Sequence, residues 1–211
     1  MTIISTSSNA LLSELSGGNA PQVDYMFGIG LVKESDAVYF QYLGDDSKEA
    51  LVYENGKPVT RFPNVRITGL SIGEGIGEFN QTKLNVFIET QQGSSIMLTS
   101  GLTTLWSKCI ITGLMGLFVQ DSLNSIINID TWKGTSKLKP CFAAVRNNGI
   151  KVVNEEIKEQ INQADKAEKE QIIRDCVALI SEAVTGLPVI ATPVEDTPVT
   201  NSQLAAVAGD F

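Results

Sequence analysis

The stretch Lys83–Ser100, KLNVFIETQQGSSIMLTS, decides the fold of this 211-residue chain. It contains two runs in which apolar and polar residues alternate, Lys83–Gln91 and Ser94–Ser100, separated by a tight turn at Gln92-Gly93. A period of two is typical of half-buried β-strands, and a glycine turn between two such runs indicates an antiparallel pair. The stretch therefore predicts a two-stranded unit with one face toward a core, around which the other elements can be placed.

The segments on either side of this unit follow a definite order. Asn64–Ile72 precedes it as a strand, and Thr103–Phe118 follows it with helical spacing and with Trp106 on the apolar side. Leu123–Trp132 and Leu138–Asn147 are two further strands. Three strands, a helix and two strands are the order of an OB-fold, a five-stranded Greek-key barrel. The sequence thus predicts a mainly β chain with helices (α+β class) built on an OB-fold barrel, although other α+β layouts share this order.

Further elements are predicted at both ends of the barrel. Ala37–Leu43 and Ala50–Tyr53 are expected to pair as an N-terminal β-hairpin. Asn154–Val184 has the amphipathic spacing of a helix with Asn154 as its N-cap, and a polar break near Asp165–Lys169 leaves open whether it is one helix or two. The predicted organisation is a flexible N-terminus (1–23), a β-rich OB-fold domain with its hairpin (24–152), a C-terminal helical segment (153–186) and a flexible tail (187–211).

The chain is acidic overall but carries one cationic strip. It has 24 acidic and 16 basic residues, which gives a net charge of −8. From Gly101 to Lys151, however, six cations face two acids. Cations interleaved with aromatic residues, as in Thr131–Arg146 (TWKGTSKLKPCFAAVR), are typical of surfaces that follow phosphates and stack bases. The alternative is a charged hairpin that keeps a strand pair in solution.

The residue types that are missing exclude several classes of site. The chain has no histidine, which excludes His-based triads and HExxH zinc sites. Its three cysteines are widely spaced without a CxxC motif, so we predict reduced core residues and no structural zinc. We therefore predict no catalytic residue, no metal and no cofactor. No apolar run is long enough to span a bilayer, and the first residues lack the basic region of a secretion signal, so we expect a cytoplasmic protein without a membrane partner.

Strand alternation points a set of large side chains away from the predicted core. In the second strand Leu84, Val86 and Ile88 take the core face, so Phe87 points outward. The same reasoning for each strand gives an outer face of two arginines, three aromatic residues and a methionine: Arg66, Phe87, Met97, Trp132, Phe142 and Arg146. Such a face predicts a base-stacking platform. The alternative is that the N-terminal hairpin or the C-terminal helix covers it and that these are second-layer core residues.

Two short motifs and the element order resemble a known family. Arg66–Gly69 (RITG) opens the first strand, and Lys139–Gly149 (KPCFAAVRNNG) forms the last strand and ends in an Asn-Gly turn. On these motifs the segment Arg61–Val152 resembles the OB-fold single-stranded DNA-binding proteins of phages and related replicons. The terminal Gly209-Asp210-Phe211 is similar to the C-terminal tips of bacterial and phage single-stranded DNA-binding proteins, which recruit partners.

The resemblance implies a non-catalytic protein that coats single-stranded DNA during replication, recombination and repair, in a bacterial or phage-infected cell. We expect the nucleic acid to contact Arg66, Phe87, Trp132, Lys133, Lys137, Lys139, Phe142 and Arg146, and replication proteins to contact Asp210 and Phe211. The sequence leaves open DNA against RNA and a homo-oligomeric state. One alternative function is a structural or assembly module of a virion or scaffold, whose exposed aromatic residues are subunit contacts. Another is a small enzyme that uses carboxylates.

Overall fold

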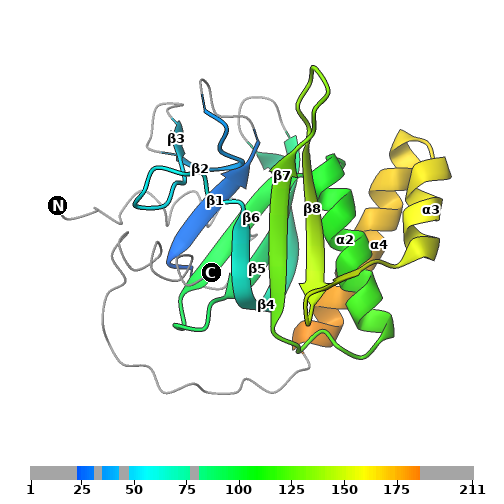
Figure 1. Cartoon of the computed structure of the whole chain (residues 1–211). Helices are drawn as coiled ribbons and strands as arrows, with labels where there is room; N and C mark the ends of the chain where they lie inside the picture. Colours follow the sequence, from blue (N-terminus) through cyan, green and yellow to red (C-terminus); the bar gives the residue numbers. More distant parts are fainter. Residues whose placement is uncertain (1–22, 31–34, 43–47, 77–80, 186–211) are drawn as a thin grey trace.

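A long, bent strand, β4 (Arg61–Ile76), organises the fold (Figure 1). The computed structural model describes residues 23–30, 35–42, 48–76 and 81–185. The first half of β4 pairs antiparallel with β7 (Ile127–Lys133), and its second half pairs antiparallel with β5 (Gln81–Glu89). The register shifts once in the first half and twice in the second, and the shift between Phe62 and Val65 includes Asn64 with a φ of 50°. Such bulges bend a strand, which lets β4 connect two parts of the sheet.

The strands form one nine-stranded sheet. Its order is β3 (Lys48–Ala50), β2 (Tyr39–Tyr42), β1 (Tyr25–Ile29), β6 (Ser95–Gly101), β5, β4, β7, β8 (Cys141–Asn147) and β9 (Ile150–Val152). The pairing of β1 with β6 is parallel, and the other pairings are antiparallel. The predicted strand pair is confirmed as β5 and β6. An N-terminal hairpin is also present, but its second strand is Lys48–Ala50 rather than the predicted Ala50–Tyr53.

The α+β class is confirmed, whereas a closed barrel is not present in the described part of the chain. The five predicted strands are β4 to β8, and α2 (Leu105–Val119) lies between the third and the fourth, as expected. In this order β6 and β8 are the two end strands, so closure would require them to pair with each other. Instead, β6 pairs with β1 and β8 pairs with β9 on their outer edges. The sheet is therefore open.

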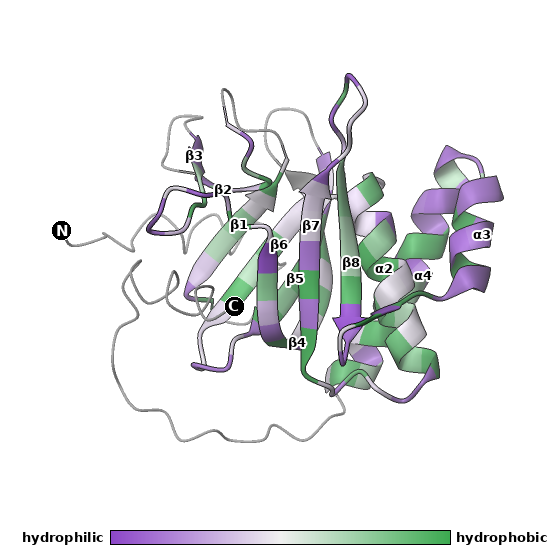
Figure 2. Ribbon diagram, in the orientation of Figure 1, coloured by the Kyte–Doolittle hydropathy of each residue, from purple (hydrophilic) through white to green (hydrophobic). Residues whose placement is uncertain are grey.

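Helices α2 and α4 (Lys166–Thr185) cover one face of the sheet and enclose the core (Figure 1). Leu84, Val86 and Ile88 lie in this core as predicted. The helical segment consists of two helices, because α3 (Glu155–Gln163) ends before the predicted polar break and α4 begins within it. Asn154 caps α3 by accepting a hydrogen bond from Ile157 N (3.0 Å). Figure 2 shows a largely hydrophilic α3, which buries little more than Ile161. Within the described residues, no helix is both long and apolar enough to cross a bilayer.

Two glycines let α2 approach the sheet closely. A Cβ atom on Gly113 would lie 2.7 Å from Val145 Cγ2 of β8. A Cβ atom on Gly116 would lie 2.7 Å from Val152 Cγ1, 3.1 Å from the carbonyl carbon of Val153 and 3.2 Å from Asn154 N. The glycines weaken helix propensity, but they are required where the helix backbone contacts β8, β9 and the start of α3.

We predict that Gly116→Ala destabilises the fold. Overpacking costs about 1–3 kcal/mol, and alanine returns about 1 kcal/mol of helix propensity. We expect the clash to prevail, because two of the three contacted atoms belong to backbone rather than to a flexible side chain. Urea unfolding should show the loss. Gly30→Ala is the matched control, because its Cβ would meet only Phe40 Cε1 at an ordinary 3.5 Å. An equal stability of the two variants would contradict the close-approach argument.

Candidate nucleic-acid interface

Trp132 of β7, which is exposed, and Phe142 of β8, which is half-buried, form an aromatic pair. They are cross-strand partners with ring centroids 6.0 Å apart and an interplanar angle of 17°. Trp132 retains 42% of its accessible surface. The neighbouring Gly134 leaves room for the Phe142 ring, since a Cβ atom there would lie 2.8 Å from Phe142 Cε2. The outward phase predicted for β7 is confirmed, because Ile127, Ile129 and Thr131 are buried on the opposite face.

Two arginines form ion pairs with one carboxylate, that of Asp130, beside this aromatic pair. Arg61 Nε donates to Asp130 Oδ1 (2.5 Å), and Arg146 Nε donates to Asp130 Oδ2 (2.6 Å). Burial opposes ionisation of Asp130, but the hydrogen bonds and charges of the two guanidinium groups hold its pKa below the ordinary value. Asp130 thus remains ionised at neutral pH and fixes both arginines. The cluster keeps one net positive charge, and the terminal nitrogens of Arg61 make no hydrogen bond to Asp130.

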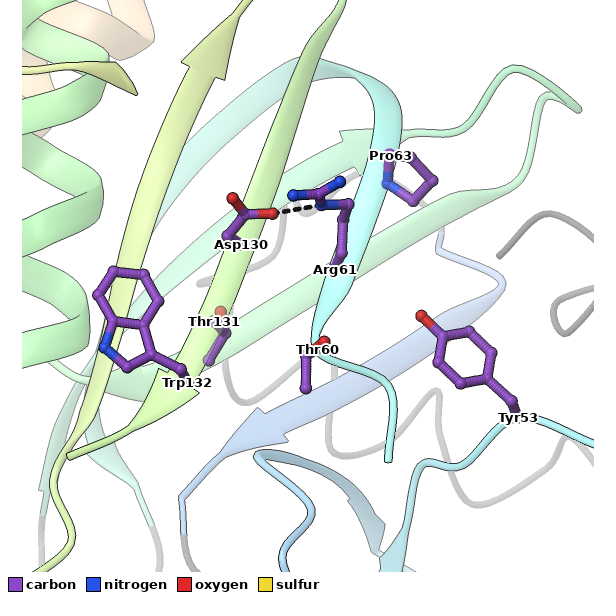
Figure 3. A pocket seen from close by; sticks show the side chains of 7 residues that line it. All are labelled: Tyr53, Thr60, Arg61, Pro63, Asp130, Thr131 and Trp132. Atoms are coloured by element: carbon purple, nitrogen blue, oxygen red, sulfur yellow. Dashed lines mark hydrogen bonds and ion pairs between the residues drawn. The ribbon is translucent and has the colours of Figure 1, made fainter. Parts of the chain in front are cut away.

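An open pocket of about 430 Å³ extends from Arg61 to the indole ring of Trp132 (Figure 3). Arg61 and Asp130 form its middle, with Trp132 at one end and Tyr53 at the other. The remaining wall consists of Thr60, Pro63 and Thr131. The pocket therefore places a cation, an exposed aromatic face and a phenol within one depression on the outer side of β4 and β7.

Arg61 and Tyr53 are site residues that the sequence pattern does not predict. The first strand was predicted to begin at Asn64, but β4 begins at Arg61 and includes Pro63. Proline is tolerated at this position because the register shift between Phe62 and Val65 interrupts the ladder there. Strict alternation continued backward from Val65 would place Arg61 on the core face. The register shift between Phe62 and Val65 reverses this phase, so Phe62 is buried and Arg61 points outward, and no sequence pattern indicated it.

The prediction that Phe87 and Met97 point to solvent is wrong. Their exposed fractions are 2% and 1%, and they form a second small apolar cluster with Val23 and Met26. The reason is the parallel pairing of β1 with β6, which places Met26 directly beside Met97. For Phe87 the alternative holds: N-terminal residues cover this face, so its ring is not available to a base in this conformation.

Two of the predicted cations do not lie with the aromatic pair. Arg66 lies on the second half of β4, where its guanidinium is 3.9 Å from the carboxylate of Glu89. Lys133 has the opposite strand phase to Trp132, and its Nζ donates to the carbonyl oxygen of Ser35 (2.8 Å). Lys133 therefore lies on the opposite face of β7 from Trp132. Arg66 lies beyond the part of β4 that pairs with β7, and its contact with nucleic acid stays a prediction.

The other two lysines remain accessible. Lys137 and Lys139 are exposed in the connection between β7 and β8, on either side of Leu138, which is 83% exposed. This connection projects beyond the end of the sheet (Figure 1). The structure thus brings together Trp132, Phe142 and Arg146, adds Arg61, and places the two lysines on the adjoining hairpin. Asp210 and Phe211 lie outside the described residues.

Comparison with protein-family models, with curated proteins and with solved structures found no match. The function therefore has to be inferred from the geometry of the site itself.

Proposed function

We propose that the protein binds single-stranded nucleic acid, principally DNA, without catalysing a reaction. The observation that carries the proposal is the exposed Trp132, paired with Phe142, beside an arginine pair held on one carboxylate. An aromatic ring supplies about 1–3 kcal/mol per stacked base. A guanidinium group offers a planar fork of donors that matches phosphate oxygens. Stacking is available to every base, so the proposed binding has little sequence preference.

The arrangement supports a path for the strand. The backbone would pass Lys137 and Lys139 on the hairpin, lay a base against Trp132, and continue toward Arg61 and Arg146. Both ends of this path are cationic, whereas the whole chain carries a charge of −8. Attraction is therefore local, and screening of these few contacts should weaken binding steeply as salt rises.

The strand order supports an OB-fold-related architecture for this function. In the proposal, β4 to β8 with α2 are an opened OB-fold whose free edges are taken by β1 and β9. The sequence resemblance supports a role in coating DNA during replication, recombination and repair. It also supports recruitment of replication proteins by the C-terminal residues, with Asp210 and Phe211 as the contact points.

The experiment that tests the proposal measures how the affinity for oligo-dT depends on salt. We expect Lys137→Gln/Lys139→Gln to weaken binding and to flatten the slope of log K against log salt by about 0.7 per lost phosphate contact. Lys133→Gln is the matched control, because the Lys133 ammonium is already bound to Ser35 O and lies away from Trp132. Its slope should equal that of the wild type. A wild-type slope in the double variant would show that the hairpin lysines do not contact phosphate.

A structural or assembly module is the second candidate. This candidate is favoured by three large apolar side chains that are exposed to solvent. They lie on β7, on the β7–β8 connection and on β9: Trp132, Leu138 and Ile150. In that case Trp132 contacts another subunit rather than a base. Sedimentation of the chain without nucleic acid separates the two candidates, because a subunit contact through Trp132 predicts an oligomer that Trp132→Ala dissociates.

A further inference from the structure

A second groove, of about 490 Å³, lies between β8, β9 and the helices α2 and α3. Four consecutive residues of β8, Phe142–Val145, line it. Successive side chains of a strand point to opposite faces. Four neighbours can therefore share one groove only if the groove follows the backbone edge of the strand.

This edge of β8 is only partly paired. β9 pairs with Val145, Arg146 and Asn147, and in the described ranges Cys141–Ala144 pair with β7 alone. Only alternate residues of an antiparallel strand direct their N–H and C=O groups to one edge. The outward-facing groups within Phe142–Ala144 thus face the groove rather than another strand. An unpaired edge of this kind is a template for an additional strand.

The groove is lined by more positive than negative charges. Glu155 accepts a hydrogen bond from Lys158 Nζ (2.6 Å), so these two charges neutralise each other. Lys108 of α2 and Lys151 of β9 line the same groove and take part in no ion pair among the described residues. Burial, together with the neighbouring charge of Lys169, lowers the pKa of Lys108. The groove is therefore short of negative charge.

We propose that this groove binds an extended, acidic peptide segment of a partner protein. The segment adds a strand to the free edge of β8, in line with β9, and places carboxylates near Lys108 and Lys151. A peptide fits better than a nucleic acid, because its backbone alone offers the alternating donors and acceptors that a strand edge requires. The groove shares no lining residue with the pocket beside Trp132, although Phe142, the partner of Trp132, lines the groove. The proposal does not depend on the proposed binding of nucleic acid.

The test uses the full chain and a fluorescein-labelled peptide of alternating valine and glutamate, followed by fluorescence anisotropy. We expect saturable binding that Lys151→Glu weakens by about tenfold or more, because a like charge then faces the peptide. Lys57→Glu is the matched control: Lys57 is equally an exposed lysine, lies in the turn before β4, and should leave the affinity unchanged. Failure of the peptide to bind up to about 1 mM would overturn the proposal.

Backbone methylation of the same peptide tests strand addition. Only every second N–H of an added strand faces β8. N-methylation of one alternate set should abolish binding, whereas methylation of the other set should preserve it. Equal affinities of the two methylated peptides would overturn the proposal. So would displacement of the peptide by oligo-dT, which assigns the groove to nucleic acid, or a dimer of the chain that the peptide dissociates, which assigns the edge to a second copy.

Discussion

Replacing Trp106 by alanine is expected to lower the free energy of unfolding by about 3–5 kcal/mol. Trp106 is fully buried in α2, and its Nε1 donates to Thr131 Oγ1 of β7 (2.9 Å). The same hydroxyl shares a hydrogen bond of 2.6 Å with the Tyr39 hydroxyl of β2. The substitution therefore leaves a large cavity and removes one member of a buried network that connects α2 with β7 and β2.

Urea denaturation followed by circular dichroism measures this effect. Trp106→Phe is the control, because it keeps an aromatic ring in the core and loses only the N–H donor and part of the ring volume, so its loss of stability should be clearly smaller. A loss below about 1 kcal/mol for Trp106→Ala would contradict the assignment of Trp106 to the core, since a buried tryptophan cannot be truncated so cheaply.

Replacing Trp132 by alanine is expected to weaken binding of oligo-dT by about 1–3 kcal/mol. At 1.4 kcal/mol per factor of ten, this is a loss of about 5- to 150-fold in affinity. Stability should change little, because Trp132 is 42% exposed and lies on the outer face of β7. The chain contains two tryptophans, so the two substitutions compare the same residue type in the core and on the proposed binding surface.

The affinity change is measured by anisotropy of a labelled oligo-dT, with unfolding measured in parallel. Ile150→Ala is the matched control: Ile150 is also a large exposed apolar residue, at 72%, but offers no aromatic face. Its affinity should equal that of the wild type. An unchanged affinity for Trp132→Ala with an intact fold would exclude Trp132 from the binding surface.

Local patterns predicted the local structure well. The turn after Gln91 and the alternation on both sides of it are sufficient for the β5–β6 pair, because side-chain burial and turn chemistry are properties of neighbouring residues. The same holds for the N-cap Asn154 and for the phase of β7, where Ile127 and Ile129 alternate with Asn128 and Asp130. Trp132 and Phe142 were predicted on the same face because the phase of each strand fixes the face of its side chains.

Such local patterns do not predict contacts between segments that are far apart in the sequence. Alternation places Phe87 on the face opposite Val86, but it does not say what covers that face. The covering residues of β1 lie about sixty positions earlier and reach it through a parallel pairing. In the same way, no local pattern shows that β6 pairs with β1 and β8 with β9, and these pairings leave the sheet open instead of closing it into the predicted barrel. Arg61 was missed because Pro63 ended the predicted strand, although a bulge accommodates it.

The proposed stacking of a single-stranded DNA base on Trp132 can be observed directly in the fluorescence emission of this one residue. In the Trp106→Phe variant Trp132 is the only tryptophan. We predict that oligo-dT quenches its fluorescence saturably, and that the titration shifts to higher oligonucleotide concentrations as salt is raised. Binding of oligo-dT detected by anisotropy without any change in Trp132 emission would contradict the account.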